Sequence, residues 1–542
     1  MTVPAAASFD ADFPLHLPDP VDAQALEADR LNLCEYYLDR NIREGRGDKV
    51  AVRMGGQERT YGEIHGRVRA LTAALREHGI REEDRVLIVL PDGFEFVEAW
   101  FAVLRAGAVF AMVNPLLKAK DFEYYLEYTK ASAVFTHGSV LPEIAEAIRG
   151  SRFIRNAYVV GDSAGARAEG FTPFEEAITQ GMESSADDGV APTGPNDLAG
   201  WLFTSGSTGE PKACVHVQRD FAYATETYAL QVAGYQESDV CLSVPKLFFG
   251  YATGTNLMFP FRVGATVVLF EGRATADEIL DQIEAHRPTF LTGVPTLFNN
   301  ILRSDRTETA DLSCLRIALS AGEALPQALY ESWKSRTGVD ILDGIGSAEM
   351  FHIYISNRPG EVVPGALGTL VPGYDAQIVD PAGHPVAPGE PGRLRIAGGS
   401  TALCYWGDKA KSNGTYQGAW CTTADVFRCD DQGVYWYVGR GDDLLKVSGI
   451  WVSPLEIENV LQSHDAVHEC CVVGREDDAG LVKAHAIVVC AEGVSGCEQV
   501  ADALKAHVKE RLAPYKYPRS FEWRTEPLPR NDRGKVARKL LS

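Results

Sequence analysis

The chain has 542 residues, which at about 150 residues per domain predicts three to four structural units. Its hydrophobic content of 45% and its length exclude a disordered protein and a small disulfide-stapled module. The 52 basic and 74 acidic side chains give a net charge of −22, which argues against binding to nucleic acid or to an anionic membrane surface.

The first 30 residues are rich in Pro, Ala and Asp and predict a loosely ordered extension without a signal peptide. The longest uncharged apolar stretch, residues 247–261, is too short and too interrupted by Gly, Asn and Pro to span a bilayer. The 11 cysteines are an odd number without a C-x-x-C pair, which suits a reducing compartment and disfavours a zinc site. We therefore expect a cytoplasmic protein.

Short apolar runs alternate with helical patterns between residues 31 and 360. The pattern predicts helices at residues 61–78, 94–105, 276–286 and 327–336, and strands at residues 86–90, 133–135, 157–160, 201–203, 265–270 and 316–320. This alternation is typical of an α/β fold with largely parallel sheets. Several runs are apolar throughout, as expected of strands that are covered on both faces.

The pattern changes after about residue 360, where Gly- and Pro-rich turns crowd around short strands at residues 393–397 and 434–437. This part predicts a β-rich subdomain that ends near residue 440. A compact unit follows, with helices at 454–462 and 496–511 and strands at 471–473 and 484–489. We therefore expect an extension over 1–30, a large domain over 31–440 and a small domain over 441–542.

The sequence TSGSTGEPK at residues 204–212 is the strongest local signal, and it follows a strand predicted to end at Phe203. Its glycines let backbone N–H groups approach a polyphosphate, and its hydroxyls and Lys212 add donors and a positive charge. It is not a Walker A loop, because Pro211 stands where the second glycine belongs and Ala213 follows the lysine. The segment predicts a phosphate-binding loop of another kind.

Together with five later motifs, this loop resembles the signature of the adenylate-forming superfamily, which includes acyl- and aryl-CoA synthetases, adenylation domains and firefly luciferase. The later motifs follow in the family order: AGEAL at 321–325, DGIGSAE at 343–349, TAD at 423–425, GRGDD at 439–443 with PLEIE at 454–458, and PRNDRGK at 529–535. The resemblance covers about residues 31–542. It implies a large domain of α/β and β-rich subdomains and a small mobile C-terminal α+β domain that rotates about a hinge near Asp442.

The resemblance also implies a ligase that uses ATP, Mg²⁺ and coenzyme A. A carboxylate attacks the α-phosphate of ATP, and a thiol then displaces AMP from the acyl-adenylate. The implied catalytic residues are Lys212, Glu349 as the Mg²⁺ ligand and Lys535, which bridges the carboxylate and the α-phosphate. The residues implied for ATP or AMP binding are Thr204, Ser205, Gly206, Ser207, Thr208, Gly209, Lys212, Gly322, Glu323, Ala324, Asp343, Gly344, Ile345, Ser347, Ala348, Asp425, Arg440 and Lys535. Without the resemblance, Glu349 reads as a solvated charge and Lys535 as part of a basic helix start.

Four positions depart from the family pattern. Ala213 and Ala424 replace glycines, and Ile345 and Ala348 replace the tyrosine and threonine that precede the metal-binding glutamate. One hydroxyl that the family offers to the α-phosphate is then missing or supplied by Ser347.

The substrate pocket resembles that of benzoate-type ligases in the segments KLFFGY at 246–251, EMFHI at 349–353 and KVSGI at 446–450. The pocket residues implied are Phe248, Phe249, Tyr251, Ala321, Gly346, Met350 and His352, and those of the hinge and the CoA tunnel are Asp442, Lys446, Ser448, Gly449 and Ile450. A flat aryl carboxylate that packs against aromatic rings is expected: benzoate, 2-aminobenzoate (anthranilate) or 2-hydroxybenzoate. His352 either recognises an ortho substituent or is a structural histidine bonded to backbone.

Three alternatives stay open from the sequence. A stand-alone adenylation enzyme would load the aryl acid onto the phosphopantetheine of a carrier protein in trans. A non-catalytic nucleotide-binding protein has slight support from Ala348. The GDSAG sequence at 161–165 fits a hydrolase nucleophile elbow at Ser163, but a loop is predicted after it where an elbow needs a helix. The oligomeric state is not predicted.

Overall fold

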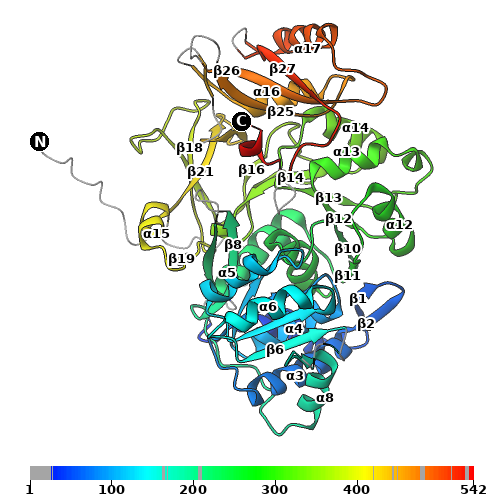
Figure 1. The fold of residues 1–542 in the computed structure, drawn as a ribbon, viewed down its shortest axis with the longest axis vertical. Helices are drawn as coiled ribbons and strands as arrows, with labels where there is room; N and C mark the ends of the chain where they lie inside the picture. Colours follow the sequence, from blue (N-terminus) through cyan, green and yellow to red (C-terminus); the bar gives the residue numbers. More distant parts are fainter. Residues whose placement is uncertain are drawn as a thin grey trace, which may run out of the picture.

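The computed structural model in Figure 1 describes residues 26–541, except 27, 162–164, 166, 168, 206–209, 419, 442–444, 448–449, 477–481, 514–515 and 531–535. Two large sheets and a β-rich unit form most of the molecule, and a smaller C-terminal unit lies at one end of its long axis. The α/β fold class is therefore confirmed. Within these described ranges, no helix has the length and apolar character needed to cross a membrane.

The first large sheet has nine strands in the order β16-β15-β14-β13-β12-β10-β11-β1-β2. Its central strands, from β14 to β1, run parallel, and β2, β15 and β16 pair antiparallel at the edges. Strands β11, β12 and β13 are buried at every position, as their continuous apolar runs predict. The bounds are β1 Val50–Met54, β2 Gln57–Thr60, β10 Val240–Ser243, β11 Thr266–Leu269, β12 Phe290–Gly293, β13 Ile317–Ser320, β14 Ile341–Gly346, β15 Ile353–Ser356 and β16 Thr369–Leu370.

The second large sheet has eight strands in the order β19-β9-β8-β4-β3-β5-β6-β7. Strands β3 to β8 pair in parallel, whereas β9 joins β8 as a hairpin and β19 closes the edge antiparallel. The bounds are β3 Arg85–Val89, β4 Val109–Met112, β5 Ala133–His137, β6 Asn156–Val160, β7 Thr172–Pro173, β8 Leu198–Ser205, β9 Pro211–Val217 and β19 Cys404–Tyr405.

Helices cover both sheets. Thr60 and Glu63 form a capping box that starts α3, and α4 is buried along almost its whole length because its residues are apolar on nearly every face. The α-helices of the large domain are α2 Arg40–Arg43, α3 Tyr61–Glu77, α4 Phe94–Arg105, α5 Ala119–Thr129, α6 Leu141–Gly150, α8 Phe174–Glu183, α9 Gln218–Ala224, α10 Gly250–Thr253, α11 Phe259–Val263, α12 Ala276–His286, α13 Pro295–Arg303, α14 Gln327–Thr337 and α15 Lys409–Thr415. The π-helical segments are η1 Glu35–Asp39, η3 Thr225–Ala233 and η4 Gly254–Met258, and the short 3₁₀ turns are η2 Gly138–Val140, η5 Asp305–Glu308, η6 Ala348–Met350 and η7 Arg538–Leu540.

Beyond the large sheets lie an antiparallel five-stranded sheet and the C-terminal unit. The five strands are β17 Asp375–Val379, β18 Gly392–Ala397, β20 Tyr416–Gln417, β21 Trp420–Cys429 and β22 Tyr435–Arg440. The C-terminal unit has the hairpin β23 Leu445–Val447 with β24 Ile450–Val452, the three-stranded sheet β25 Val467–Glu476, β26 Val482–Cys490 and β27 Ser520–Arg524, and the helices α16 Pro454–Gln462 and α17 Glu498–Arg511.

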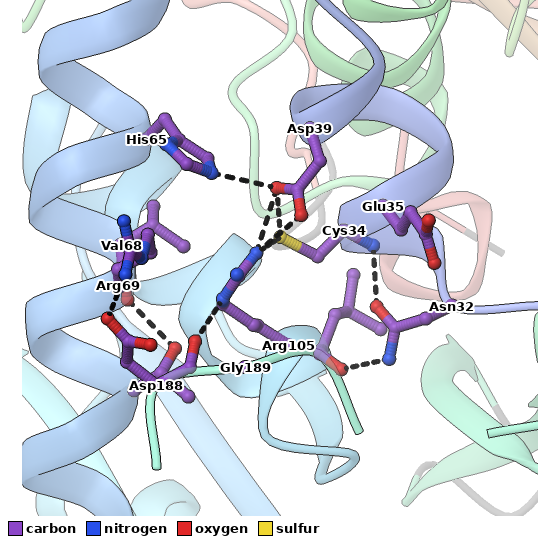
Figure 2. Close-up of polar contacts among 12 residues, drawn as sticks. Asn32, Cys34, Glu35, Asp39, His65, Val68, Arg69, Arg105, Asp188 and Gly189 are labelled. Carbon is purple, nitrogen blue, oxygen red and sulfur yellow. Dashed lines mark hydrogen bonds and ion pairs between the residues drawn. The ribbon is translucent and has the colours of Figure 1, made fainter. Parts of the chain in front are cut away.

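A polar cluster fastens the beginning of the described chain to the large domain (Figure 2). Asp39, the last residue of η1, accepts hydrogen bonds from Arg105 of α4 at 2.8 and 2.7 Å. His65 of α3 lies 3.4 Å from the same carboxylate, and Asn32 donates to the carbonyl oxygen of Leu104. Residues 32–39 are therefore attached to α3 and α4 by ionic and hydrogen-bond contacts as well as by apolar packing.

The predicted helices at 94–105, 276–286 and 454–462 agree with α4, α12 and α16 to the residue. The predicted strands are at the correct places, but several are too short. Strand β8 was expected to end at Phe203 and instead continues to Ser205, because Thr204 and Ser205 pair with Lys212 and Pro211 of β9. Lys212 therefore lies in a strand. Ser163 of the GDSAG sequence lies outside the described residues.

Candidate active site

The hairpin of β8 and β9 contains the described ends of the predicted phosphate loop, Thr204 and Ser205 in β8 and Lys212 in β9. Lys212 is the second residue of β9, and its Nζ lies 3.0 Å from Oδ2 of Asp408. Asp408 also accepts a hydrogen bond from the backbone N–H of Lys411 and thereby caps the start of α15. The hydroxyl of Tyr124 donates to the carbonyl of Pro211 in β9, and the hydroxyl of Tyr128 accepts from the backbone N–H of Ala213 in the same strand. The ammonium of Lys212 is thus held at the base of the loop.

The predicted metal ligand Glu349 lies in the short turn η6 and has a fixed orientation. Its Oε1 accepts a 2.7 Å hydrogen bond from the Tyr405 hydroxyl, and its carbonyl accepts from the N–H of Ala402. His216 supports the same turn, because its Nε2 donates to the carbonyl of Ala348 at 2.7 Å and its Nδ1 lies 2.9 Å from Asp220. The turn that carries the carboxylate is therefore tied to β9 and β19.

Several buried polar atoms near this turn have no hydrogen-bond partner among the described residues. Two of them are Oδ1 of Asp343 on β14 and Oγ of Ser347. Burial raises the pKa of Asp343 to about 7. Since an unpaired buried polar atom is costly, both atoms fit a site whose remaining partners come with a ligand. The position of Ser347 suits the sequence expectation that it supplies the hydroxyl absent at Ala348.

The AGEAL segment forms the loop after β13. Gly322 has φ +89°, a conformation that other residues rarely adopt, so the turn needs glycine here. Glu323 accepts a 2.8 Å hydrogen bond from the hydroxyl of Thr296, and it also pairs with Arg530 of the C-terminal unit. Ala321 is buried in the core, and Ala324 lies in the same loop. Ser320 and Asp343 pair in register on β13 and β14, so this loop lies beside the Asp343 carboxylate.

The predicted ribose-binding pair comes from the five-stranded sheet. Asp425 of β21 lies directly opposite Arg440 of β22 in the antiparallel ladder, and Tyr437 donates to Asp425 at 3.3 Å. The pKa of the buried Tyr354 hydroxyl is raised first by burial and then by the charges of Asp425 and Glu349. The two predicted acidic groups therefore both act on the pKa of one tyrosine although 76 residues separate them along the chain.

An aromatic enclosure surrounds His352, three residues after Glu349. Its ring centroid lies 5.4 Å from the ring centroids of both Tyr228 and Tyr251, and 4.6 Å from that of Phe259 in an edge-to-face arrangement. The Nε2 atom donates to the carbonyl of Tyr251 at 3.2 Å, whereas Nδ1 has no partner among the described residues. Burial lowers the pKa of His352 to about 3, so the ring is neutral near pH 7. The backbone bond is the one that the structural interpretation of this histidine predicts.

The other predicted pocket residues lie around this enclosure. The rings of Phe248 and Phe249 contact each other with centroids 4.5 Å apart, and both are half-buried. Met350 is fully buried. A Cβ at Gly346 would lie 2.4 Å from the carbonyl oxygen of His352, so only glycine allows β14 to pass this close.

Next to the enclosure, Phe351 has φ +64°, which is uncommon for a bulky residue. Backbone strain of this kind persists where the surrounding structure holds it and is frequent at functional sites. It turns the chain sharply between Glu349 on one side and His352 on the other. The strain therefore lies at the junction of the predicted metal and acyl sites.

Several predicted site residues fall outside the described part of the chain. They belong to the phosphate loop, the hinge, the CoA tunnel and the lysine motif. In that order they are Gly206, Ser207, Thr208 and Gly209; Asp442; Ser448 and Gly449; and Lys535. Lys446 and Ile450 are described by their backbone, which belongs to the β23–β24 hairpin, and Ser205 by its backbone in β8.

Sequence reasoning missed four residues that support the site: Tyr228, Tyr405, Asp408 and His216. Each acts through a partner far away in the sequence, such as Glu349 for Tyr405 and Lys212 for Asp408. No local pattern marks them. The segment CYWGD at 404–408 is short and aromatic, and only the folded chain shows that both of its ends reach predicted site residues.

The site fits the binding of Mg²⁺ together with a nucleotide. Across the described ranges, no group of three or more His, Cys, Asp or Glu side chains is arranged to hold a metal ion. Mg²⁺ is commonly bound by one or two carboxylates with substrate phosphates and water completing its coordination, so Glu349 alone is a suitable protein ligand.

Comparison with known proteins assigns the family. The model of the AMP-binding enzyme family matches residues 38–406, and that of the AMP-binding enzyme C-terminal domain matches residues 456–535. A benzoate–CoA ligase of Thauera aromatica is 39% identical over 512 residues, which cover 94% of this chain and 95% of that protein.

Two solved structures agree. The anthranilate CoA ligase AuaEII in complex with anthranoyl-AMP superposes with a TM-score of 0.89 at 36% identity, over 95% of this chain and 97% of that chain. A benzoate CoA ligase from Burkholderia xenovorans LB400 gives 0.85 at 39% identity, over 94% and 99% of the two chains. The chain therefore belongs to the AMP-binding family of adenylate-forming enzymes, within the branch of the benzoate-type aryl-CoA ligases.

Proposed function

We propose that this enzyme ligates benzoate or an ortho-substituted benzoate to coenzyme A. The observation that carries the proposal is the aromatic enclosure around His352, which directly follows the turn of Glu349. Flat rings gain from offset or edge-to-face contacts with such walls. The relatives named above act on benzoate or anthranilate, which supports the same class of acid.

The reaction has two steps. A carboxylate oxygen of the acid attacks the α-phosphorus of ATP, the bond to pyrophosphate breaks, and the acyl-adenylate forms. The sulfur of CoA then attacks the acyl carbon, AMP leaves, and the thiol proton is released. Neither step requires the protein to form a covalent bond, so catalysis consists of positioning the reactants and stabilising charge.

The described residues would share this work as follows. Lys212 would leave Asp408 for the β- and γ-phosphates, and Ser347 would donate its unpaired hydroxyl to the α-phosphate. Glu349, oriented by Tyr405, would hold Mg²⁺, which neutralises phosphate charge when bound. Asp425 would accept from the ribose hydroxyls with Arg440 opposite it. Lys535, which lies outside the described residues, would bridge the carboxylate and the α-phosphate.

The chemistry of His352 favours an ortho substituent that carries hydrogen. A carbonyl oxygen can only accept, so the bond to Tyr251 places the ring proton on Nε2 and leaves Nδ1 as an acceptor. This acceptor is buried and has no partner among the described residues. An amino or hydroxyl group at the ortho position of the acid would satisfy it, whereas benzoate would leave it unpaired at a cost of about 1–3 kcal/mol.

The test is pyrophosphate release with ATP and Mg²⁺ over a panel of acids, each with and without CoA. The panel contains benzoate, 2-aminobenzoate, 2-hydroxybenzoate, 2-methylbenzoate and medium-chain fatty acids. We expect CoA-dependent turnover with aryl acids, and a kcat/KM for 2-aminobenzoate about tenfold above that for 2-methylbenzoate, which has a similar shape but no donor. Turnover with fatty acids alone would contradict the aryl pocket, and equal values for the two ortho compounds would contradict the role of His352.

The remaining expectations are proposals of the same kind. The C-terminal unit would rotate about Asp442 between the two steps, and the β23–β24 hairpin would then approach the CoA tunnel. Acid-dependent release of pyrophosphate that CoA does not accelerate would instead indicate a carrier protein as the acceptor. We place the enzyme in the cytoplasm, where ATP and CoA are available.

A further inference from the structure

Part of the aromatic wall of the pocket, namely Phe248, Phe249 and Tyr251, is carried by residues 244–253, which we call the gate segment. It leaves the nine-stranded sheet at the end of β10 and lies against the carboxyl ends of strands in the other large sheet. The hydroxyl of Thr253 lies 3.6 Å from Sδ of Met112 in β4, and a Cβ at Gly250 would touch Leu202 of β8. The gate segment therefore follows a strand of the nine-stranded sheet in the chain, but it packs against strands of the eight-stranded sheet.

Asp92 makes the polar link between the two. It follows β3, just before α4 begins, and is 3% exposed. Its Oδ1 accepts a 2.7 Å hydrogen bond from the backbone N–H of Leu247, and its Oδ2 lies 3.9 Å from Nζ of Lys246. Both partners immediately precede Phe248. A buried carboxylate is costly unless it is paired, so this aspartate needs the gate segment as much as the segment needs it.

Lys246 is anchored beyond Asp92. Its ammonium donates to the carbonyl of Phe270 at 2.5 Å and lies 3.4 Å from the centroid of the Phe270 ring, a cation–π contact. Further along the segment, Thr253 donates to the carbonyl of Leu247 at 2.6 Å. The backbone on both sides of the Phe248–Phe249 pair is thereby fixed through hydrogen bonds.

We propose that Asp92 is a positioning residue for the aryl-acid pocket: through Leu247 and Lys246 it sets the placement of Phe248, Phe249 and Tyr251. This inference rests on the proposed function of the site. Asp92 touches neither the acid nor ATP in this role. Its loss should therefore weaken the recognition of the acid and leave the recognition of ATP intact.

The electrostatics separate this role from a merely structural one. Burial raises the pKa of Asp92 to about 6, against the opposing effects of Lys246 and of the Leu247 hydrogen bond. The pKa of Lys246 is lowered by burial, while the charges of Asp92, Glu278 and Glu271 act to raise it. The ionised aspartate is thus disfavoured in the folded protein, so keeping it charged near pH 7 costs stability and is explained better by function.

The test compares Asp92→Asn with Asp239→Asn. Asp239 lies at the other end of β10, is 2% exposed, accepts from the N–H of Gln236 at 2.7 Å and pairs with Arg316 at 2.7 Å. It is thus a buried aspartate with the same kinds of partner and no contact with the gate segment. We expect Asp92→Asn to raise the KM for the best aryl acid about tenfold, with the KM for ATP changed by less than about twofold. Asp239→Asn should lower stability and leave both KM values unchanged.

A pH series provides the second readout. In the wild type, the affinity for the acid should fall as the pH drops below about 6, because protonated Asp92 no longer balances the charge of Lys246. In Asp92→Asn this dependence should disappear. Lys246→Met, which keeps the bond between Asp92 and Leu247, should also raise the KM for the acid selectively, and it serves if Asp92→Asn does not fold.

The outcomes are distinct. If wild-type turnover does not depend on both an aryl acid and CoA, the proposed function fails. If the wild type is active but the variants raise the KM values for acid and ATP together, or change stability alone, the positioning role of Asp92 is wrong.

Discussion

Asp39 and Asp92 are two carboxylates inside the large domain, and the fold shifts their pKa values in opposite directions. Burial acts to raise the pKa of Asp39, but hydrogen bonds from His65 and Arg105 and the charge of Arg105 hold it below its usual value (Figure 2). At Asp92, burial prevails and the pKa rises to about 6. Both groups have a cation beside them, so the presence of a counter-charge alone does not determine the outcome.

The difference lies in how the cation is held. Arg105 places one nitrogen within 2.8 Å of both oxygens of Asp39, whereas the ammonium of Lys246 stays 3.9 Å from Asp92 and gives its hydrogen bond to Phe270. A close, hydrogen-bonded pair offsets the cost of removing charge from water, and a looser one does not. The first arrangement fastens the N-terminal segment, and the second leaves an anchor that responds to pH.

The largest effect is expected when the close pair is broken on its cationic side. Arg105→Met leaves the Asp39 carboxylate without its main partner and should lower the free energy of unfolding by about 3–5 kcal/mol. Urea denaturation at pH 7 measures this. A loss below about 1 kcal/mol would show that the cluster in Figure 2 does not hold the segment.

Asp39→Asn should cost somewhat less, about 2–3 kcal/mol at pH 7, because the amide keeps part of the hydrogen bonding but leaves Arg105 unbalanced. Since the folded pKa of Asp39 is lowered, its contribution is present above the unfolded value of about 3.9 and is lost as the pH falls through the folded pKa. The gap between wild type and variant should therefore narrow in acid. A gap that stays constant as the pH is lowered from 7 to well below 3.8 would contradict the pairing.

Asp92→Asn should change stability in the other direction. The folded pKa is raised from 3.8 to about 6, which corresponds to at most about 3 kcal/mol of cost once the group is ionised. This upper bound already includes the attraction of Lys246, and we expect a net gain of about 1–2 kcal/mol. The gain should be present above pH 6 and vanish near pH 4, where the wild-type carboxyl is itself protonated. Thermal unfolding at pH 8 and pH 4 provides the measurement.

Substitution of Glu35 is expected to change the free energy of unfolding least among the variants considered. It lies four residues before Asp39, and its carboxylate pairs with Arg43 at 3.0 Å with both side chains at least half exposed. Exposed pairs contribute little because water and salt screen them, so Glu35→Gln should change stability by less than about 0.5 kcal/mol. A larger change in the same urea experiment would mean that position in η1, and not burial, controls the strength of these pairs.

The sequence alone predicted the α/β fold class, and it predicted the helices whose apolar residues recur with a clear helical period. Helix α4 could be located to the residue because its apolar run begins after Gly93 and ends before Gly107, both clear boundaries. Strand ends were harder. Thr204 and Ser205 are polar and look like loop residues, yet their backbone pairs with β9 across the hairpin, which their composition does not indicate.

The supporting residues of the site could not be predicted for the same reason. The motifs place Glu349 and Lys212 in a family order, but the partners that orient them, Tyr405 and Asp408, are 56 and 196 residues away. Asp92 looks like an ordinary turn residue between a strand and a helix. Only the packing of two sheets, which depends on the whole chain, brings it against Lys246.

Because Lys212 is already paired with Asp408, its binding to a nucleotide would replace one ionic partner by another. Oδ1 of Asp408 accepts from Lys411 and caps α15, so the carboxylate stays fixed when the ammonium moves. If Lys212 passes to a phosphate as proposed, one ionic contact is broken for each one formed, and few counter-ions are released on its account. This lysine would then add little to the dependence of ATP affinity on ionic strength, and it would select for phosphate geometry more than for total negative charge.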